Sequence, residues 1–246
     1  MKIDVIGDVH GCIDELHALL KKLGYVLKNK KYKHPEGRIL VFAGDITDRG
    51  PHSLDVIRLV HQMVVKDKMA KYVPGNHCNK LYRFFHGNNV QQKHGLETTA
   101  AEYHALNPKE QQKVRRQFIE LYDQAPLYLQ IPEVNVIVAH AGIKEEFIGR
   151  TDSKVRTFVF YGDITGKFDN DRKPIRGDWA KHYHGKRWIV YGHTPVKEAR
   201  IINNTINIDT GCVFGNALSS FRLPEKLVVS VPSQQPLEKE KFRKFD

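Results

Sequence analysis

Cysteine is scarce in this chain, and its few copies show no pairing pattern. The 246 residues contain only Cys12, Cys78 and Cys212, an odd number without C-x-x-C spacing. A disulfide framework is therefore not expected, and neither is a cysteine-rich structural zinc site. We predict a reducing, cytoplasmic compartment, because disulfide scaffolds belong to oxidising ones.

Long apolar runs are also missing. No run approaches the roughly 18 residues that a membrane-spanning helix needs. The first residues, MKIDVIGDVHG, do not resemble a signal peptide, because their short apolar stretch meets Asp8 and His10 at once. There is no internal repeat. The compositionally biased segments at 28–34 (KNKKYKH) and 238–246 (EKEKFRKFD) are expected to be solvent-exposed loops or ends.

Positive charge is what the chain has in excess. The formal net charge is +11, and 41% of the residues are hydrophobic. This length and composition suit one domain, 1–246, with a sizeable core. The basic balance indicates anionic partners but says nothing about the fold.

Six short apolar runs each end in polar side chains. Runs rich in valine and isoleucine are typical of buried strands. They are followed by Asp8 and His10 (after IDVIG), Asp45, Asp48 and Arg49 (RILVFAG), Asn76 and His77 (KYVPG), His140 (VNVIVA), His193 (RWIVYG), and Asp209 (TINI). Helical patterns such as CIDELHALLKKLG separate several runs, which predicts an α/β sandwich. Ligands of such sheets bind beyond the carboxyl ends of the strands, where these side chains would gather.

Two further segments have no such strand end. Residues 80–130 contain the helical patterns LETTAAEYHAL and NPKEQQKVRRQFIELYDQA, with Asn107 and Pro108 as a start signal. We predict a helical insertion that either caps the site and selects substrate or only packs beside it. Residues 162–179 are predicted to form a long polar loop.

The polar clusters offer carboxylate, amide and imidazole groups without a thiolate. This mixture suits Mn, Fe, Ni, Co or Zn. In Asp8-x-His10 the two side chains would face the same way on a strand. Asp45 could bridge two ions through its two oxygens, and ions about 3.5–4 Å apart can hold a hydroxide that attacks a phosphoryl group in line.

These residues form motifs that resemble a known family. GDVHG (7–11), GDITDRG (44–50), GNH (75–77), HAG (140–142) and GHT (192–194) occur in the order and spacing of calcineurin-like metallophosphatases, which include the protein Ser/Thr phosphatases. The tract YGDITG…RGDWAKHYHGKRWIVYGHTPV and the stretch IDTGCVFG look like bacterial asymmetric bis(5′-nucleosyl)-tetraphosphatases. They also look like the phosphatase module of bacterial polynucleotide kinase-phosphatases. The resemblance implies a four-layer α-β-β-α sandwich.

The resemblance also implies a role for each matching residue. Asp8 and His10 would hold a first ion, Asp45 would bridge, and Asn76, His140 and His193 would hold a second. Arg49 would bind phosphoryl oxygens. His77 would protonate the leaving oxygen while Asp48 orients it. The ions implied by the family are Mn or Ni.

One residue departs from the family pattern. Many relatives carry glutamate after GNH, where this chain has Cys78, which puts the surroundings of His77 in doubt. All three cysteines directly follow a motif. We favour a buried packing role for them over a redox role; the alternative is that thiol oxidation inactivates the enzyme.

The predicted activity is asymmetric hydrolysis of dinucleoside tetraphosphates, a nucleotide-binding hydrolase reaction that yields a nucleoside triphosphate and a monophosphate. The alternatives are a phosphoprotein or RNA-end phosphatase and, in another class, an RNA-binding protein. A further phosphate contact is expected from Arg176, with Arg156 and Arg150 as weaker candidates. No membrane partner is expected.

Overall fold

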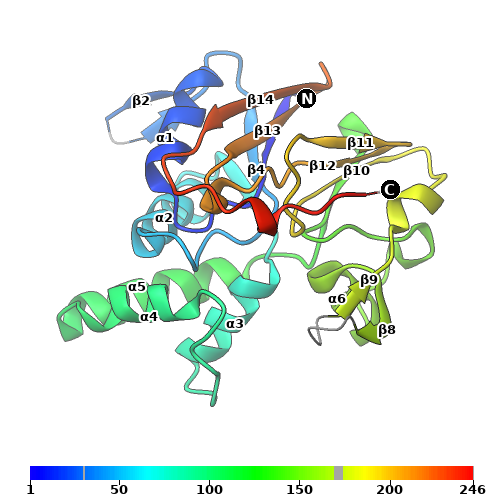
Figure 1. Cartoon of the computed structure of the whole chain (residues 1–246). Coiled ribbons are helices and arrows are strands. Elements are labelled where there is room, and N and C mark those ends of the chain that lie inside the picture. The colour runs from blue at the N-terminus through cyan, green and yellow to red at the C-terminus, as the bar shows by residue number, and fades with distance from the viewer. Residues whose placement is uncertain (30, 169–173, 246) are drawn as a thin grey trace.

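The computed structural model describes residues 1–29, 31–168 and 174–245 (Figure 1). Among them are two five-stranded mixed sheets, ordered β14-β13-β1-β4-β5 and β11-β12-β10-β7-β6. The strands are β1 (Ile3–Ile6), β2 (Val26–Lys28), β3 (Lys31–Lys33), β4 (Ile39–Phe42), β5 (Ala70–Tyr72), β6 (Leu129–Ile131), β7 (Val136–Val138), β8 (Ile164–Phe168), β9 (Pro174–Arg176), β10 (Trp188–Tyr191), β11 (Arg200–Ile202), β12 (Thr205–Asn207), β13 (Ala217–Leu223) and β14 (Leu227–Pro232).

The six apolar runs are all strands, as predicted, and they divide equally between the sheets. β1, β4 and β5 are parallel neighbours in the first sheet. β7, β10 and β12 are parallel neighbours in the second. The carboxyl ends of each group therefore lie along one edge of its sheet, where parallel sheets bind ligands.

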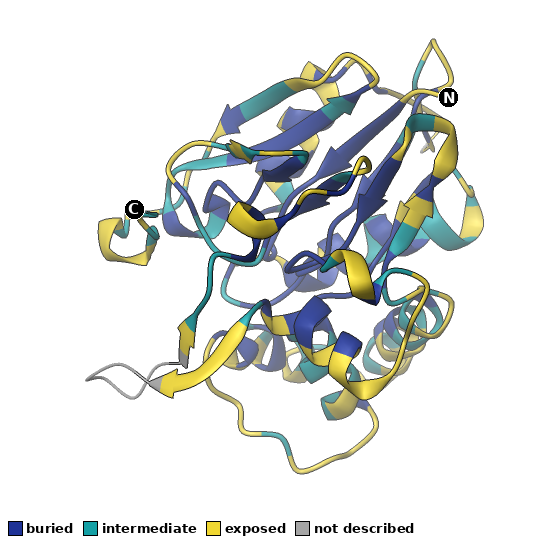
Figure 2. Cartoon of the chain, turned by 90° about the vertical axis from the view of Figure 1, so that its right-hand side faces the viewer, coloured by how far each residue is buried: buried dark blue, intermediate teal, exposed yellow. Residues whose placement is uncertain are grey.

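Alternation along the strands explains how two sheets and two helical layers pack. In β4, Val41 faces the core between the sheets, whereas Leu40 and Phe42 face the helices. In β10, Val190 faces the same inter-sheet core and Ile189 faces the opposite helical layer. This period of two is that of strands buried on both faces. The four-layer α-β-β-α fold is thus confirmed, and Figure 2 shows how strongly burial concentrates in the sheets.

Helices cover both outer faces. They are α1 (Ile13–Lys22), α2 (Ser53–His61), α3 (Asn76–Phe85), α4 (Leu96–His104), α5 (Pro108–Asp123) and α6 (Ser153–Tyr161), with a π-helical turn η1 (Gln62–Lys66) and the 3₁₀ turns η2 (Pro132–Val134), η3 (Glu145–Phe147), η4 (Trp179–His182), η5 (Cys212–Phe214) and η6 (Lys239–Lys241). α1 to α5 share a core with the first sheet, and α6 packs on the second with η3 and η4. None of the helices in the described ranges is long and apolar enough to cross a membrane.

The helices predicted between 80 and 130 are present. α5 begins after Asn107, whose side chain accepts a hydrogen bond from the Glu110 amide over 3.0 Å. Phe118 of α5 joins the same apolar core as Ile57 and Val60 of α2. The segment therefore lies against the helical layer of the first sheet (Figure 1).

The prediction of a loop is wrong for two segments, 28–34 and 162–179. Within 28–34, Lys28 ends β2 and Lys31–Lys33 form β3, which pairs with β2 antiparallel; Tyr32 is buried between exposed lysines, and residue 30 lies outside the described residues. This period-two pattern was masked by the high lysine content. The 162–179 loop contains the antiparallel strands β8 and β9, while its part 169–173 lies outside the described residues.

Candidate metal centre

The carboxyl edges of the two sheets meet at a cluster of buried polar side chains. Asp8 and His10 follow β1, Asp45 follows β4, and His140 follows β7; none of the four is more than 4% exposed. Isolated charges are costly at such depth, so their burial needs compensation by partners or a cation.

Four of the predicted ligands converge on one point. His140 Nε2 lies 3.0 Å from Asn76 Oδ1, 3.1 Å from His193 Nδ1 and 3.2 Å from Asp45 Oδ2. The other ring nitrogen of His140 can donate to the Ala43 carbonyl oxygen over 3.2 Å, which leaves Nε2 free to bind a metal. The donor set of oxygen and imidazole nitrogen fits a borderline divalent ion.

The orientation of the Asn76 amide shows whether this residue can serve as a metal ligand. Its oxygen faces only hydrogen-bond acceptors, and turning the amide would let its nitrogen donate to His140, His193 and Asp45 over 2.9–3.2 Å. With the oxygen inward, the contacts are satisfied by a proton on His140 Nε2 or by a cation among the ligand atoms. The amide thus satisfies the cluster either as a donor or as a metal ligand.

A second group of ligand atoms surrounds His10. Its Nε2 lies 3.9 Å from both Asp8 Oδ2 and Asp45 Oδ2. Its Nδ1 is 2.7 Å from the Thr47 carbonyl oxygen, to which it can donate. Asp45 therefore faces both groups, as a bridging carboxylate would. His10, Asp45 and His77 also form a geometric trio with ligand atoms within 4.8 Å of one another, so His77 lies beside this group.

His77 is held by a carboxylate that the insertion supports. His77 Nδ1 lies 2.8 Å from Asp48 Oδ2. The hydroxyl of Thr99, in α4, donates to Asp48 Oδ1 over 2.7 Å and accepts from the Asp48 amide over 3.1 Å. Nothing in the sequence marks Thr99, because its partner is 51 residues away. The insertion thus braces the residue that orients His77.

Burial and mutual repulsion perturb the carboxyl groups. Burial, with the charge of Asp209, raises the pKa of Asp8 well above its usual range. Burial raises the pKa of Asp209 to about 6. Burial opposes ionisation of Asp45 too, but His140 and His77 outweigh it and hold its pKa well below normal. Sequence reasoning noticed Asp209 at a strand end and gave it no role.

The histidines divide into two kinds. Burial lowers the pKa of His10 and of His193 well below normal, with nearby cations adding to the effect. Both are therefore neutral, as metal ligands must be. Burial also opposes protonation of His140, but Asp45 and Asp8 outweigh it and raise its pKa to about 9. A divalent ion would meet the same demand for positive charge at this point.

The loops that carry the cluster are conformationally strained. Five of the ten predicted site residues, His10, Asp45, Asp48, Arg49 and His193, have φ between 32° and 74°. Non-glycine residues seldom adopt this left-handed region, and it costs about 1–3 kcal/mol each when they do. Surrounding packing must hold these residues in place, which is typical of functional sites.

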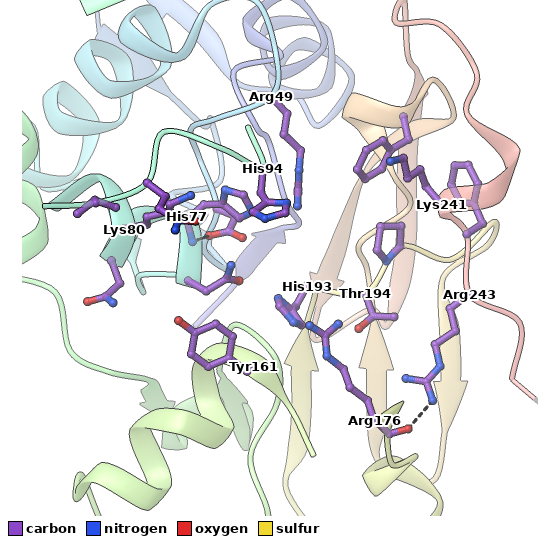
Figure 3. Close-up of a pocket in the computed structure, with 18 of the residues that line it drawn as sticks. Arg49, His77, Lys80, His94, Tyr161, Arg176, His193, Thr194, Lys241 and Arg243 are labelled. Atoms are coloured by element: carbon purple, nitrogen blue, oxygen red, sulfur yellow. Dashed lines mark hydrogen bonds between the residues drawn. The ribbon is translucent and has the colours of Figure 1, made fainter. Parts of the chain in front are cut away.

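The cluster opens into a basic cavity of about 1140 Å³ (Figure 3). Arg49 and Arg176 both line it, whereas Arg150 and Arg156 are exposed residues near and on α6 and do not. Of the three predicted arginines, Arg176 is thus the one that lines the cavity, and its contact with phosphate stays a prediction. The prediction of a solvated end holds for the exposed residues Lys239, Glu240, Lys241 and Lys244, but it is wrong for Phe242 and Arg243, which are half-buried and line the cavity.

The cysteines are all free and buried. Burial raises the pKa of Cys78 to about 12. A hydrogen bond with Cys12, together with burial, raises the pKa of Cys212. Protonated buried thiols react slowly, so these environments agree with the packing role. Inactivation by oxidation stays an untested prediction.

A buried carboxylate, amide and imidazole cluster at the strand ends of an α-β-β-α sandwich defines a metal-dependent phosphoesterase class. The family model described as calcineurin-like phosphoesterase matches residues 1–212. The chain belongs to this family.

Relatives and solved structures extend the comparison. The chain is 63% identical to bis(5'-nucleosyl)-tetraphosphatase PrpE [asymmetrical] of Oceanobacillus iheyensis, over 100% of this chain and 98% of that protein. It is 58% identical to the protein of the same name from Bacillus cereus, over 99% of each. A crystal structure of a candidate diadenosine tetraphosphatase has a TM-score of 0.68 at 24% identity, covering 94% of this chain and 93% of that one. A Saccharomyces cerevisiae protein serine/threonine phosphatase has a TM-score of 0.59 at 15% identity, covering 97% and 81%. These two structural likenesses support the fold alone.

Proposed function

We propose that this protein hydrolyses dinucleoside tetraphosphates asymmetrically to a nucleoside triphosphate and a nucleoside monophosphate. The observation that carries the proposal is the convergence of buried metal-ligand atoms at the floor of a large basic cavity. The relatives at about 60% identity, which bear this activity in their name, support the choice of substrate.

Each site residue has a proposed task. Asp8 and His10 would hold one divalent ion, Asp45 would bridge, and Asn76, His140 and His193 would hold the second. The 3.0–3.2 Å separations around His140 Nε2 support the second set. When bound, the ions would activate the attacking water and neutralise charge on the phosphoryl group.

Charge and proton handling would fall to other side chains. Arg49 Nη1 donates to His10 Nε2 over 2.7 Å, so its guanidinium reaches the centre and can bind phosphoryl oxygens. Arg176 would bind them from the opposite wall. His77 would give its proton to the leaving oxygen through Nε2, since Nδ1 is engaged with Asp48.

We propose Mn or Ni as the ions. The donor set of carboxylate, amide and imidazole also accommodates Fe, Co or Zn. The preference for Mn or Ni therefore rests on the resemblance to the family. Reconstitution of chelator-treated protein with each ion, followed by activity and metal-content measurements, would decide among them.

The test is hydrolysis of diadenosine tetraphosphate by metal-loaded protein, with products separated by anion exchange. Asp45→Asn should lose at least about 1000-fold in rate and most of its bound metal, because a bridging ligand is gone. Asp55→Asn is the matched control, since Asp55 is an exposed aspartate on α2. It should leave both quantities unchanged.

The product pattern discriminates between the candidate activities. ATP and AMP in equal amounts would support the proposal. Two ADP molecules would mean that the bond between the middle phosphates is cut, and they would contradict it. No turnover, with p-nitrophenyl phosphate still hydrolysed, would point to a phosphoprotein or RNA-end phosphatase. Full activity of Asp45→Asn would contradict the metal assignment.

A further inference from the structure

The C-terminal segment, residues 238–245, is fixed against the loops that border the metal centre. The Glu238 amide donates to the Phe214 carbonyl oxygen over 3.1 Å, and the Arg243 amide donates to that of Pro195 over 2.8 Å. The ring of Phe242 lies so close to Gly211 that a Cβ there would collide with it. The segment is therefore a pre-positioned wall of the cavity, despite its charged composition.

Two cationic residues of this segment lie next to the arginines that are proposed to bind phosphate: Lys241 is near Arg49, and Arg243 is next to Arg176. Arg49 and Lys241 both lie over the ring of Phe214, at 5.3 Å and 5.6 Å from its centre. On the other side, Arg243 Nη2 donates to the carbonyl oxygen of Arg176 over 2.8 Å. Figure 3 shows Arg176 beside His193, with Arg243 next to it and farther from the centre.

The Arg176–Arg243 pair lacks an anionic partner in the described part of the chain. Arg176 Nε is buried and has no hydrogen-bond partner. Burial and the charge of Arg243 lower the pKa of Arg176. Two guanidinium groups that repel each other at a cavity wall, one with an unsatisfied buried donor, form a site that favours a bound anion.

The cavity as a whole is larger and more positive than one phosphate requires. At about 1140 Å³ it exceeds the roughly 300–1000 Å³ typical of small-ligand pockets. Its lysine and arginine side chains are Arg49, Lys80, Arg83, Arg176, Lys241 and Arg243, against the carboxyl groups of Asp45 and Glu240. A chain of several phosphates matches this excess of positive charge.

We propose that Lys241 and Arg243 bind the phosphates that are not cleaved, and thereby make the centre selective for polyphosphate substrates over simple phosphate esters. This inference rests on the proposed function. One phosphate would bind between Arg49 and Arg176 at the metals, and the following phosphates would reach Lys241 and Arg243. The C-terminal segment would then hold the triphosphate side of the substrate and favour cleavage at the first phosphate.

The test compares ATP and orthophosphate as competitive inhibitors of p-nitrophenyl phosphate hydrolysis, at fixed free metal in excess over nucleotide. Arg243→Ala should raise the inhibition constant of ATP roughly tenfold. The constant of orthophosphate, which has no outer phosphates, should change by less than about twofold. Lys241→Ala should shift the same ratio in the same direction. Lys241 is exposed, so this variant should fold.

Lys244→Ala is the matched control, because Lys244 is an exposed lysine of the same segment that does not line the cavity. It should leave both inhibition constants unchanged. Equal shifts for ATP and orthophosphate, or no shift in either variant, would overturn the inference. Wild-type protein that forms no ATP and AMP from diadenosine tetraphosphate would sink the proposed function, whereas the ATP-to-orthophosphate ratio would still decide the role of the segment.

Discussion

Replacement of Thr99 by valine tests whether the helical insertion serves the reaction. The change preserves shape and removes one hydroxyl, which donates to Asp48 Oδ1 and is one of two acceptors for the Asp48 amide. Both residues are completely buried. Asp48 Oδ2 would still accept from His77, but the carboxylate would lose half of its support.

The magnitude follows from these contacts. A hydrogen bond to a charged group contributes about 1.5–3 kcal/mol. The additional buried methyl group of valine contributes about 0.8 kcal/mol, which offsets part of this loss. The free energy of unfolding should therefore fall by about 1–2 kcal/mol. If poorer orientation of His77 raises the activation free energy by the same about 1–2 kcal/mol, kcat should fall about five- to thirtyfold.

The assay combines urea unfolding with kcat for phenyl phosphate, whose leaving oxygen needs a proton. Metal content should not change, because Thr99 lies behind Asp48 and not among the ligand atoms. Thr157→Val is the matched control: the hydroxyl of this exposed threonine of α6 donates to the Ser153 carbonyl oxygen of the same helix, and its loss should shift stability by less than about 0.5 kcal/mol. Equal behaviour of the two variants in both assays would refute the bracing role of α4.

Three further substitutions have distinct expected outcomes. His77→Ala should reduce kcat for phenyl phosphate about 10²–10⁴-fold and that for p-nitrophenyl phosphate far less, because nitrophenolate leaves without a proton; equal losses would contradict an acid role. Gly75→Ala should cost bound metal in mass spectrometry, since a Cβ there would overlap Asp45 Oδ1; full occupancy would contradict this. Asp4→Asn should cost about 3–5 kcal/mol in urea unfolding with kcat unchanged, because buried Asp4 pairs with Arg38 and Arg222; unaltered stability would contradict it.

The strands and the metal cluster could be predicted from sequence because their signals are local. A short apolar run identifies a buried strand, and the polar residue after it occupies the ligand-binding edge of the sheet. Asp45 and His140 could thus be placed together although they are far apart in the chain.

Features that depend on distant partners escaped prediction for a physical reason. Thr99 matters only because the fold brings α4 to Asp48, and no local pattern records that contact. The segment 238–245 misled in the opposite direction: its charges suggested a solvated end, but Phe242 and Arg243 pack against loops that follow β10 and β12. The composition of a segment indicates how exposed it is on average, whereas its position in the fold depends on a few contacts such as those of Phe242 and Arg243.

Local sequence patterns and long-range contacts correspond to two parts of the molecule. The calcineurin-like family model ends at residue 212, so it includes every proposed metal ligand and excludes the C-terminal segment. The relatives named as asymmetrical tetraphosphatases align over the entire chain, with that segment included. Metal chemistry common to a broad family would thus reside in the strand ends. Choice among phosphate substrates would depend on the wall that Lys241 and Arg243 add to the cavity, because this wall, with Phe214, lies beyond the shared part.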